Sequence, residues 1–257
     1  MHLNLLMMLN KAHFLLMILT LTITISGCEK DDAMPELDRL KLLSSEQSNG
    51  GETILYFYDN NDRVSMIETP EVISNYFYEG NRIIVEGYIV PIQDSVTSEV
   101  FLNDRSLADS IVTGNETTIY EYDDNDYLIK EIRTINSFVS SERRYFYDAN
   151  NNLERVLGYF SASVTSNAIT ETILYTYYEN EENERSNYNR GLYYGGKPSE
   201  NLLKSSIYER SDSDILSFND YSYDRDSDGC LLSVTVESYS SSFPNNRSSS
   251  TIYLTYQ

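Results

Sequence analysis

The sequence lacks tryptophan entirely and has only two histidines and two cysteines in 257 residues, against 23 tyrosines. Both histidines, His2 and His13, lie within the apolar N-terminal segment, so the chain beyond residue 27 has none. Serine and cysteine hydrolases that use a histidine base, and histidine-ligated zinc or iron sites, are therefore excluded.

Positive charge is also scarce, because 19 basic residues face 40 acidic ones and the formal net charge is −21. Residues 1–27 contain one lysine and no acid, so the remaining chain carries 18 basic and 40 acidic residues, a net charge of −22. Such a charge disfavours nucleic acids and anionic membrane surfaces as partners, because both would repel the chain.

One apolar run stands out, at residues 14–23 behind Lys11, and it ends in Ile25-Ser26-Gly27-Cys28. This ending resembles the bacterial lipobox, which implies a lipoprotein signal peptide at 1–27, translated from Met1, Met7 or Met8, and a lipid such as palmitate on Cys28. An ordinary secretory signal and an uncleaved anchor are the alternatives. With Cys28 acylated, Cys230 is the only remaining cysteine and no intramolecular disulfide can form.

A charged tether follows the cysteine, and we assign it residues 28–36. Its first residues, Glu29, Lys30, Asp31 and Asp32, are similar to the export signal that sends Bacteroidota lipoproteins to the outer face of the outer membrane. The alternative is that these charges only solvate the tether.

The remaining residues, 37–257, repeat a short motif in which two tyrosines flank one residue and precede an acidic or amide-rich turn. The copies begin at Tyr56, Tyr76, Tyr120, Tyr145, Tyr175 and Tyr221. Tyrosines two apart share one face of a strand, and the Asp, Asn and Gly residues behind them form turns, so each copy predicts half of a β-hairpin.

Alternating apolar residues and turn signals together predict about 15 strands in this region. The strongest are at 53–58, 83–89, 117–122, 128–135, 142–147, 169–177, 231–239 and 251–256. The uneven spacing of the copies predicts a long antiparallel meander, curled into a barrel-like or roll-like all-β domain behind the N-terminal signal helix. An irregular insertion interrupts this single domain at about 179–200.

These hairpins resemble YD repeats. Together with Gly196-Lys197-Pro198-Ser199-Glu200-Asn201-Leu202-Leu203 they are similar to a family of Bacteroidota lipoproteins of unknown function. The resemblance implies a porin-like antiparallel β fold and brings no activity with it. A true membrane barrel is disfavoured, because strands of six to eight residues are shorter than the about 9–11 that cross a bilayer, and charged residues interrupt them.

Three groups of residues are candidates for function. Tyrosines outside the repeat, Tyr188, Tyr193 and Tyr194, are candidates for a ligand surface, since exposed tyrosines stack on sugars or contact proteins. Carboxylates could serve a glycan hydrolase, although no pair among the 40 acids is marked as catalytic.

The third group is Asp224, Asp226 and Asp228, whose spacing is typical of a calcium loop. Position 12 of that loop is Thr235 instead of a bidentate glutamate, and strands instead of helices flank it. The alignment of Asp224 with Asp59 favours a hairpin turn, so we expect no cofactor beyond the lipid.

We therefore expect a lipid-anchored, surface-exposed outer-membrane protein that acts as a non-catalytic binding or structural module, with a glycan or an envelope protein as partner. A carboxylate-dependent glycan hydrolase is the alternative function.

Overall fold

A computed structural model describes residues 42–160, 169–183, 192, 194–227 and 229–256 of the chain. Every regular element in these residues is a β-strand. The sixteen strands are β1 (Leu43–Ser48), β2 (Thr53–Tyr58), β3 (Val64–Glu68), β4 (Val72–Glu79), β5 (Arg82–Ile89), β6 (Asp94–Leu102), β7 (Ala108–Thr113), β8 (Glu116–Tyr122), β9 (Leu128–Ile135), β10 (Phe138–Tyr147), β11 (Leu153–Phe160), β12 (Ile169–Glu182), β13 (Asn201–Arg210), β14 (Ser217–Arg225), β15 (Leu231–Ser240) and β16 (Phe243–Tyr256). No helix in the described residues is long and apolar enough to span a membrane.

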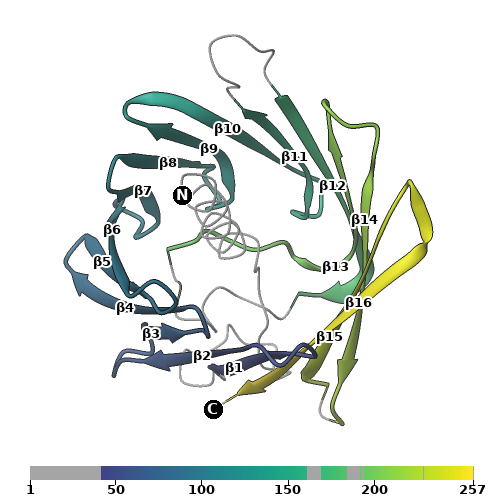
Figure 1. Cartoon of the computed structure of the whole chain (residues 1–257), viewed down its shortest axis with the longest axis horizontal. Helices are drawn as coiled ribbons and strands as arrows, with labels where there is room; N and C mark the ends of the chain where they lie inside the picture. The colour runs from purple at the N-terminus through teal and green to yellow at the C-terminus, as the bar shows by residue number, and fades with distance from the viewer. Residues whose placement is uncertain (1–41, 161–168, 184–191, 193, 228, 257) are drawn as a thin grey trace.

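The strands form one closed antiparallel barrel in which each strand pairs with its neighbours in sequence (Figure 1). Closure is made between the first and last strands, where Leu43 lies opposite Tyr256 and Ser48 lies opposite Ile252. The expected all-β fold is confirmed, and the meander that the sequence predicts with about 15 strands closes completely with 16.

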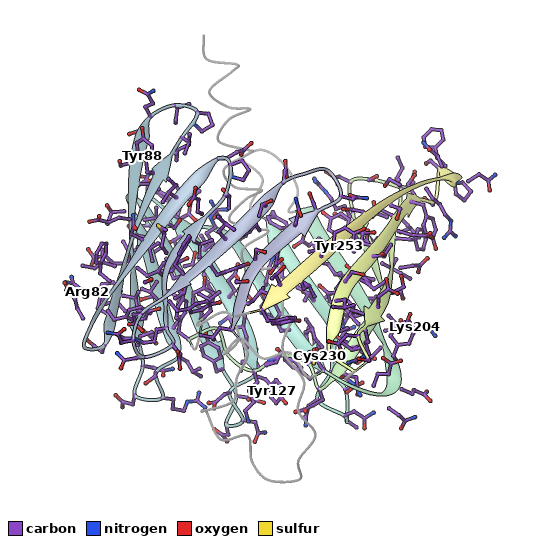
Figure 2. All side chains as sticks on the ribbon, turned by 90° about the horizontal axis from the view of Figure 1, so that it is seen from below. Arg82, Tyr88, Tyr127, Lys204, Cys230 and Tyr253 are labelled. Carbon is purple, nitrogen blue, oxygen red and sulfur yellow. The ribbon has the colours of Figure 1, made fainter. Side chains whose placement is uncertain are left out.

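The two ends of the barrel differ. Hairpins with a recurring acidic or amide turn gather at one end, which we call the turn end, and Tyr127 and Cys230 mark it in Figure 2. The described hairpins at the opposite end, which we call the rim, join β1 to β2, β3 to β4, β5 to β6, β7 to β8, β9 to β10, β13 to β14 and β15 to β16, and Tyr88 marks it in Figure 2. Every hairpin therefore points either to the turn end or to the rim.

Strand alternation separates an interior face from an outer face. The interior is built from buried apolar residues contributed by strands far apart in sequence. The most deeply buried are Leu43, Val64, Ile83, Val100, Leu202 and Leu231. Buried residues from β1 to β7, β13, β15 and β16 form one apolar cluster, and burial of one strand face fixes the register of its hairpin.

The outer face carries charged side chains that pair across neighbouring strands. Arg82 on β5 lies 3.0 Å from Glu99 on β6, and Lys130 on β9 lies 3.0 Å from Glu121 on β8. Arg247 on β16 lies 3.0 Å from Glu237 on β15. The outer wall therefore carries charged side chains on many of its strands and is not uniformly apolar.

β12 continues to Glu182, within the region that the sequence marks as irregular. Residues 194–200, which precede β13, cross the interior (Figure 1). The backbone N–H of Ala108 on β7 donates to the Tyr194 carbonyl at 3.0 Å. On the other side, the Leu153 N–H on β11 donates to Ser199 Oγ at 3.0 Å. This segment therefore ties β7 to β11 across the turn end.

Candidate functional site

The acidic residues of the repeat shape the hairpin turns. Asp123 Oδ1 accepts hydrogen bonds from the backbone N–H groups of Asn125 at 2.9 Å and Tyr127 at 2.8 Å. Asp59 and Asp148 accept the equivalent pairs in their own turns. In each turn the carboxylate accepts backbone N–H groups that the tight turn leaves without a backbone acceptor. These acids are therefore structural parts of the hairpins.

The Asp59 turn is also held by an ion pair. Burial would raise the pKa of Asp59, but the Arg63 guanidinium and the N–H groups of Asn61 and Arg63 outweigh it and lower the pKa below its usual value. The ion pair, 2.6 Å between Arg63 Nη2 and Asp59 Oδ2, therefore supports the ionised carboxylate in this turn.

The proposed calcium loop contains the same turn, shifted by two residues. Asp226, not Asp224, occupies the position of Asp59, because Asp226 Oδ1 accepts the Cys230 N–H at 2.8 Å and Gly229 has a φ of 86°. Asp224 lies within β14 and accepts a hydrogen bond from Ser233 Oγ at 3.0 Å. Asp228 lies outside the described residues.

No three His, Cys, Asp or Glu side chains in the described residues are grouped as they would be around a metal ion. Calcium binding at Asp224, Asp226 and Asp228 thus remains a sequence prediction. β14 runs two residues further than the repeat predicts, so its turn begins at Asp226 instead of Asp224.

In the repeats other than that of Tyr122, the second tyrosine has a recurring role, which Tyr256 on β16 shares. Its hydroxyl donates to the backbone carbonyl at the start of an adjacent strand, at distances from 2.7 to 3.1 Å. The donor and acceptor pairs are Tyr58 with Leu43, Tyr78 with Val64, Tyr147 with Leu128, Tyr177 with Leu153, Tyr223 with Leu203, and Tyr256 with Leu231. This ring of bonds joins neighbouring strands near the turn end, and we call its members the carbonyl-bonded tyrosines.

The first tyrosine of each repeat faces the barrel interior at a level nearer its middle. Tyr56 donates to Glu46 Oε1 at 3.0 Å, and Tyr145 donates to Glu131 Oε2 at 3.2 Å. Both carboxylates are buried. Tyr56 and Tyr145 therefore contact polar groups of the interior instead of the backbone of the wall.

A buried ion-pair cluster lies on the interior wall of β9–β12. Arg143 Nε lies 2.9 Å from Glu171 Oε1, and Arg143 Nη1 lies 3.7 Å from Glu131 Oε1. Glu171 is only 2% exposed. Burial raises the pKa of Glu131, and the neighbouring Arg143 charge opposes this rise. The cluster is a fixed polar patch in the interior of the barrel.

Sequence reasoning did not single out these three residues. Their signal is a charged side chain at the inward position of a strand, such as Glu131 among the alternating residues of β9. This signal can be recognised only when the inward face of each strand is known. The pairing of β9 with β10, and of β11 with β12, brings the three residues together.

The tyrosines expected to form a ligand surface are only partly described. Tyr194 packs against the core cluster, and its carbonyl accepts the hydroxyl of Tyr122 at 3.4 Å. Gly196 beside it has a φ of 78°, and an added Cβ would lie 2.8 Å from the Tyr122 ring. Tyr194 is therefore an interior residue, whereas Tyr188 and Tyr193 lie outside the described residues.

The N-terminal calls fall outside the described residues as well. They are the acylated Cys28 and the export signal formed by Glu29, Lys30, Asp31 and Asp32.

Two solved structures share the barrel. A porin-like protein from Bacteroides uniformis is 15% identical with a TM-score of 0.61, and the match covers 84% of this chain and 98% of that one. A porin-like protein from Bacteroides vulgatus is 12% identical with a TM-score of 0.57, covering 84% and 99%. At this identity the likeness shows the fold alone. No family model and no curated protein matches the sequence.

Proposed function

We propose that this chain is a lipid-anchored protein of the outer membrane that faces the cell exterior, and that its barrel is a non-catalytic binding module. The glycan or envelope protein expected from the sequence is its partner. The signal peptide, acylated Cys28 and export signal belong to this proposal together with the barrel that follows them.

The charged outer wall is the observation that carries the proposal. A barrel that spans a bilayer presents an apolar band to lipid, and charged side chains on that face are destabilising by an amount that depends on their depth. Here Arg82, Lys130 and Arg144 lie on the outer wall with carboxylate partners. Such a wall suits water, so membrane attachment falls to the lipid on Cys28.

A binding role fits the interior better than hydrolysis does. A glycan hydrolase needs two opposed carboxyl groups, of which one protonates the leaving group and the other attacks or activates water. Glu131 and Glu171 are buried acids on the interior wall, but Arg143 pairs with both. Two carboxyl groups held by the same guanidinium form a fixed polar wall and do not have the separate roles of acid and base.

The anchor is tested by membrane fractionation. We expect Cys28→Ala to move the protein from the membrane to the soluble fraction, while the matched Cys230→Ala variant stays in the membrane. A Cys28→Ala protein that resists extraction from membranes by alkaline carbonate would show that the barrel itself is inserted, and would contradict the proposal.

Orientation needs a separate measurement. Replacement of Lys30, Asp31 and Asp32 by alanine should leave the lipid attached but protect the protein from protease added to intact cells. Unchanged digestion of this variant would remove the export signal from the proposal.

A further inference from the structure

Large apolar side chains are exposed at the tips of four rim hairpins. The two most exposed in the described residues are Phe138, at 78% in the β9–β10 hairpin, and Phe243, at 66% in the β15–β16 hairpin. Ile92 is 47% exposed in the β5–β6 hairpin, and Ile215 is 47% exposed in the connection from β13 to β14. Each of these four hairpins therefore presents an apolar side chain to its surroundings.

The turn end has no equivalent feature. Its described connections are rich in Asp, Asn and Gly, and they lie at 59–63, 80–81, 103–107, 123–127, 148–152 and 226–230. No large apolar side chain among their described residues is exposed, since Leu107 and Tyr127 are buried. Single exposed apolar residues are common on protein surfaces, but a set confined to the tips at one end marks an interaction surface.

The four tips surround the mouth of the barrel instead of forming one patch. Two strands separate β6 from β9 and β10 from β13, and four separate β16 from β5. Figure 2 shows Tyr88 and the β15–β16 hairpin at the same end, on opposite sides of the barrel. A barrel of sixteen strands is on the order of 30 Å across, so these tips are too far apart to cover one another. A flat surface contacts all four at once.

Prolines beside the tips suit contact with lipid. Pro91 precedes Ile92, and Pro244 follows Phe243. A backbone N–H that enters lipid loses its bond to water, and proline has no such N–H. Two of the four tips therefore lack a backbone donor beside the apolar side chain that would enter the lipid.

Charged groups near the tips limit the depth of this contact and select the type of lipid. On the β15–β16 hairpin, Arg247 lies 3.0 Å from Glu237 on the outer wall, and a charged pair is costly to remove from water. The exposed acids Asp94 and Asp214 lie beside the tips of their own hairpins. Acids at the rim repel anionic headgroups, so a zwitterionic surface fits better than an anionic one.

The lipid proposed on Cys28 brings a bilayer within reach of the rim. β1 begins at the turn end, where the Leu43 carbonyl accepts the Tyr58 hydroxyl at 2.8 Å. Residues 28–41 span up to about 50 Å when extended, whereas tilted strands of about 8–10 residues make a barrel only about 25 Å high. This length allows the tether to pass the whole barrel. The membrane that holds the lipid is thus a flat surface at high effective concentration.

We propose that the rim lies on a zwitterionic bilayer surface, with Ile92, Phe138, Ile215 and Phe243 in the interfacial layer. The proposal rests on the lipid anchor argued above and adds the orientation of the barrel. The turn end then points away from the membrane, towards the glycan or protein partner. Because only the hairpin tips enter the lipid, this contact orients the barrel and does not replace the lipid on Cys28 as the anchor.

The absence of tryptophan from the chain allows a direct test, because one introduced tryptophan is the only indole in the protein. The acylated full chain is reconstituted with phosphatidylcholine vesicles, with or without bromine on the acyl chains, and bromine quenches tryptophan fluorescence on contact. We expect Phe138→Trp and Phe243→Trp each to lose about half of their emission in brominated vesicles. The matched control is Asn150→Trp, at an exposed turn-end tip, which should keep its emission.

A second substitution tests whether the tips act together. Phe138→Ser, added to Phe243→Trp, should reduce the quenching at least about twofold, because one of the apolar contacts with lipid is removed. The control is Phe77→Ser, which removes an exposed apolar side chain from β4 at the other end of the barrel and should leave the quenching unchanged. Circular dichroism checks that each variant keeps the barrel.

The outcomes separate the rim contact from the anchor. Vesicle-bound protein whose rim reporters are not quenched would overturn the rim contact and leave the anchor intact. Quenching of Asn150→Trp alone would place the turn end on the membrane and refute the proposal. A blue shift of the rim reporters that depends on protein concentration, without quenching, would assign the rim to contact between copies of the chain. Protein that does not float with the vesicles would contradict both the anchor and the rim contact.

Discussion

At the scale of single residues, Gly158 shows how the barrel interior accommodates a buried charge. It lies on β11 between Arg143 and Glu171 in the strand register. A Cβ at this position would lie 2.5 Å from both Cγ and Oε1 of Glu171. The missing side chain thus provides the space that the Glu171 carboxylate occupies beside Arg143.

Replacement of Gly158 by alanine tests this fit. The Glu171 side chain is buried and held by Arg143, so it must shift at the expense of the ion pair, and we expect a loss of about 2–3 kcal/mol in the free energy of unfolding. Urea denaturation measures the loss. The control is Gly50→Ala, where a Cβ meets only Ser48 Oγ at 3.5 Å, and a similar loss there would contradict the explanation.

At the scale of elements, two neighbouring acids in a turn-end hairpin have different roles. Asp123 accepts two backbone N–H groups, whereas the adjacent Asp124 side chain makes no hydrogen bond within the described residues. The positive φ of 70° at Asp126 completes the turn. The acid at the first position of the turn is therefore structural, and the next one contributes mainly charge.

A pair of alanine variants measures this difference. Asp123→Ala should lower the free energy of unfolding by about 1–2 kcal/mol, because two turn N–H groups lose their acceptor, while Asp124→Ala should change it by less than about 0.5 kcal/mol. Hydrogen exchange of the Asn125 and Tyr127 amides locates the effect. Equal destabilisation by both variants would mean that charge, not hydrogen bonding, stabilises the turn.

At the scale of the whole molecule, the barrel is stabilised by many buried neutral tyrosines. Burial is the first cause that raises the pKa of each of these hydroxyls above the ordinary value of 10.0. The group includes Tyr76, Tyr120, Tyr122, Tyr145, Tyr147, Tyr175 and Tyr177. Their protonated form is therefore favoured by the folded state.

The consequence is a steep loss of stability at alkaline pH. Below pH 10 tyrosines are protonated in both states, whereas above pH 10 the unfolded chain releases protons that the folded barrel retains. Stability is thus fully present below pH 10 and falls as pH rises towards the folded pKa values. We expect phenolate absorbance to rise together with loss of β-sheet circular dichroism, whereas gradual ionisation of a folded barrel would contradict the burial of these hydroxyls.

Much of the fold could be predicted because its signals are local. Alternation and turn residues place the strands at 53–58 and 128–135 with the bounds that the structure has. The turn acids and paired tyrosines likewise follow from spacing within one hairpin. The shift from Asp224 to Asp226 was missed, because both acids fit the repeat and only the pairing of β14 with β15 distinguishes them.

By itself, the sequence determined an all-β antiparallel meander without a histidine in its body, since strand period, turn chemistry and composition are properties of short segments. Tertiary structure alone decided that the meander closes, because closure depends on the register summed over sixteen strands. It also decided which side chains meet inside. Glu131, Arg143 and Glu171 are brought together by strand pairing, and Tyr194 reaches the interior because the segment before β13 crosses the barrel.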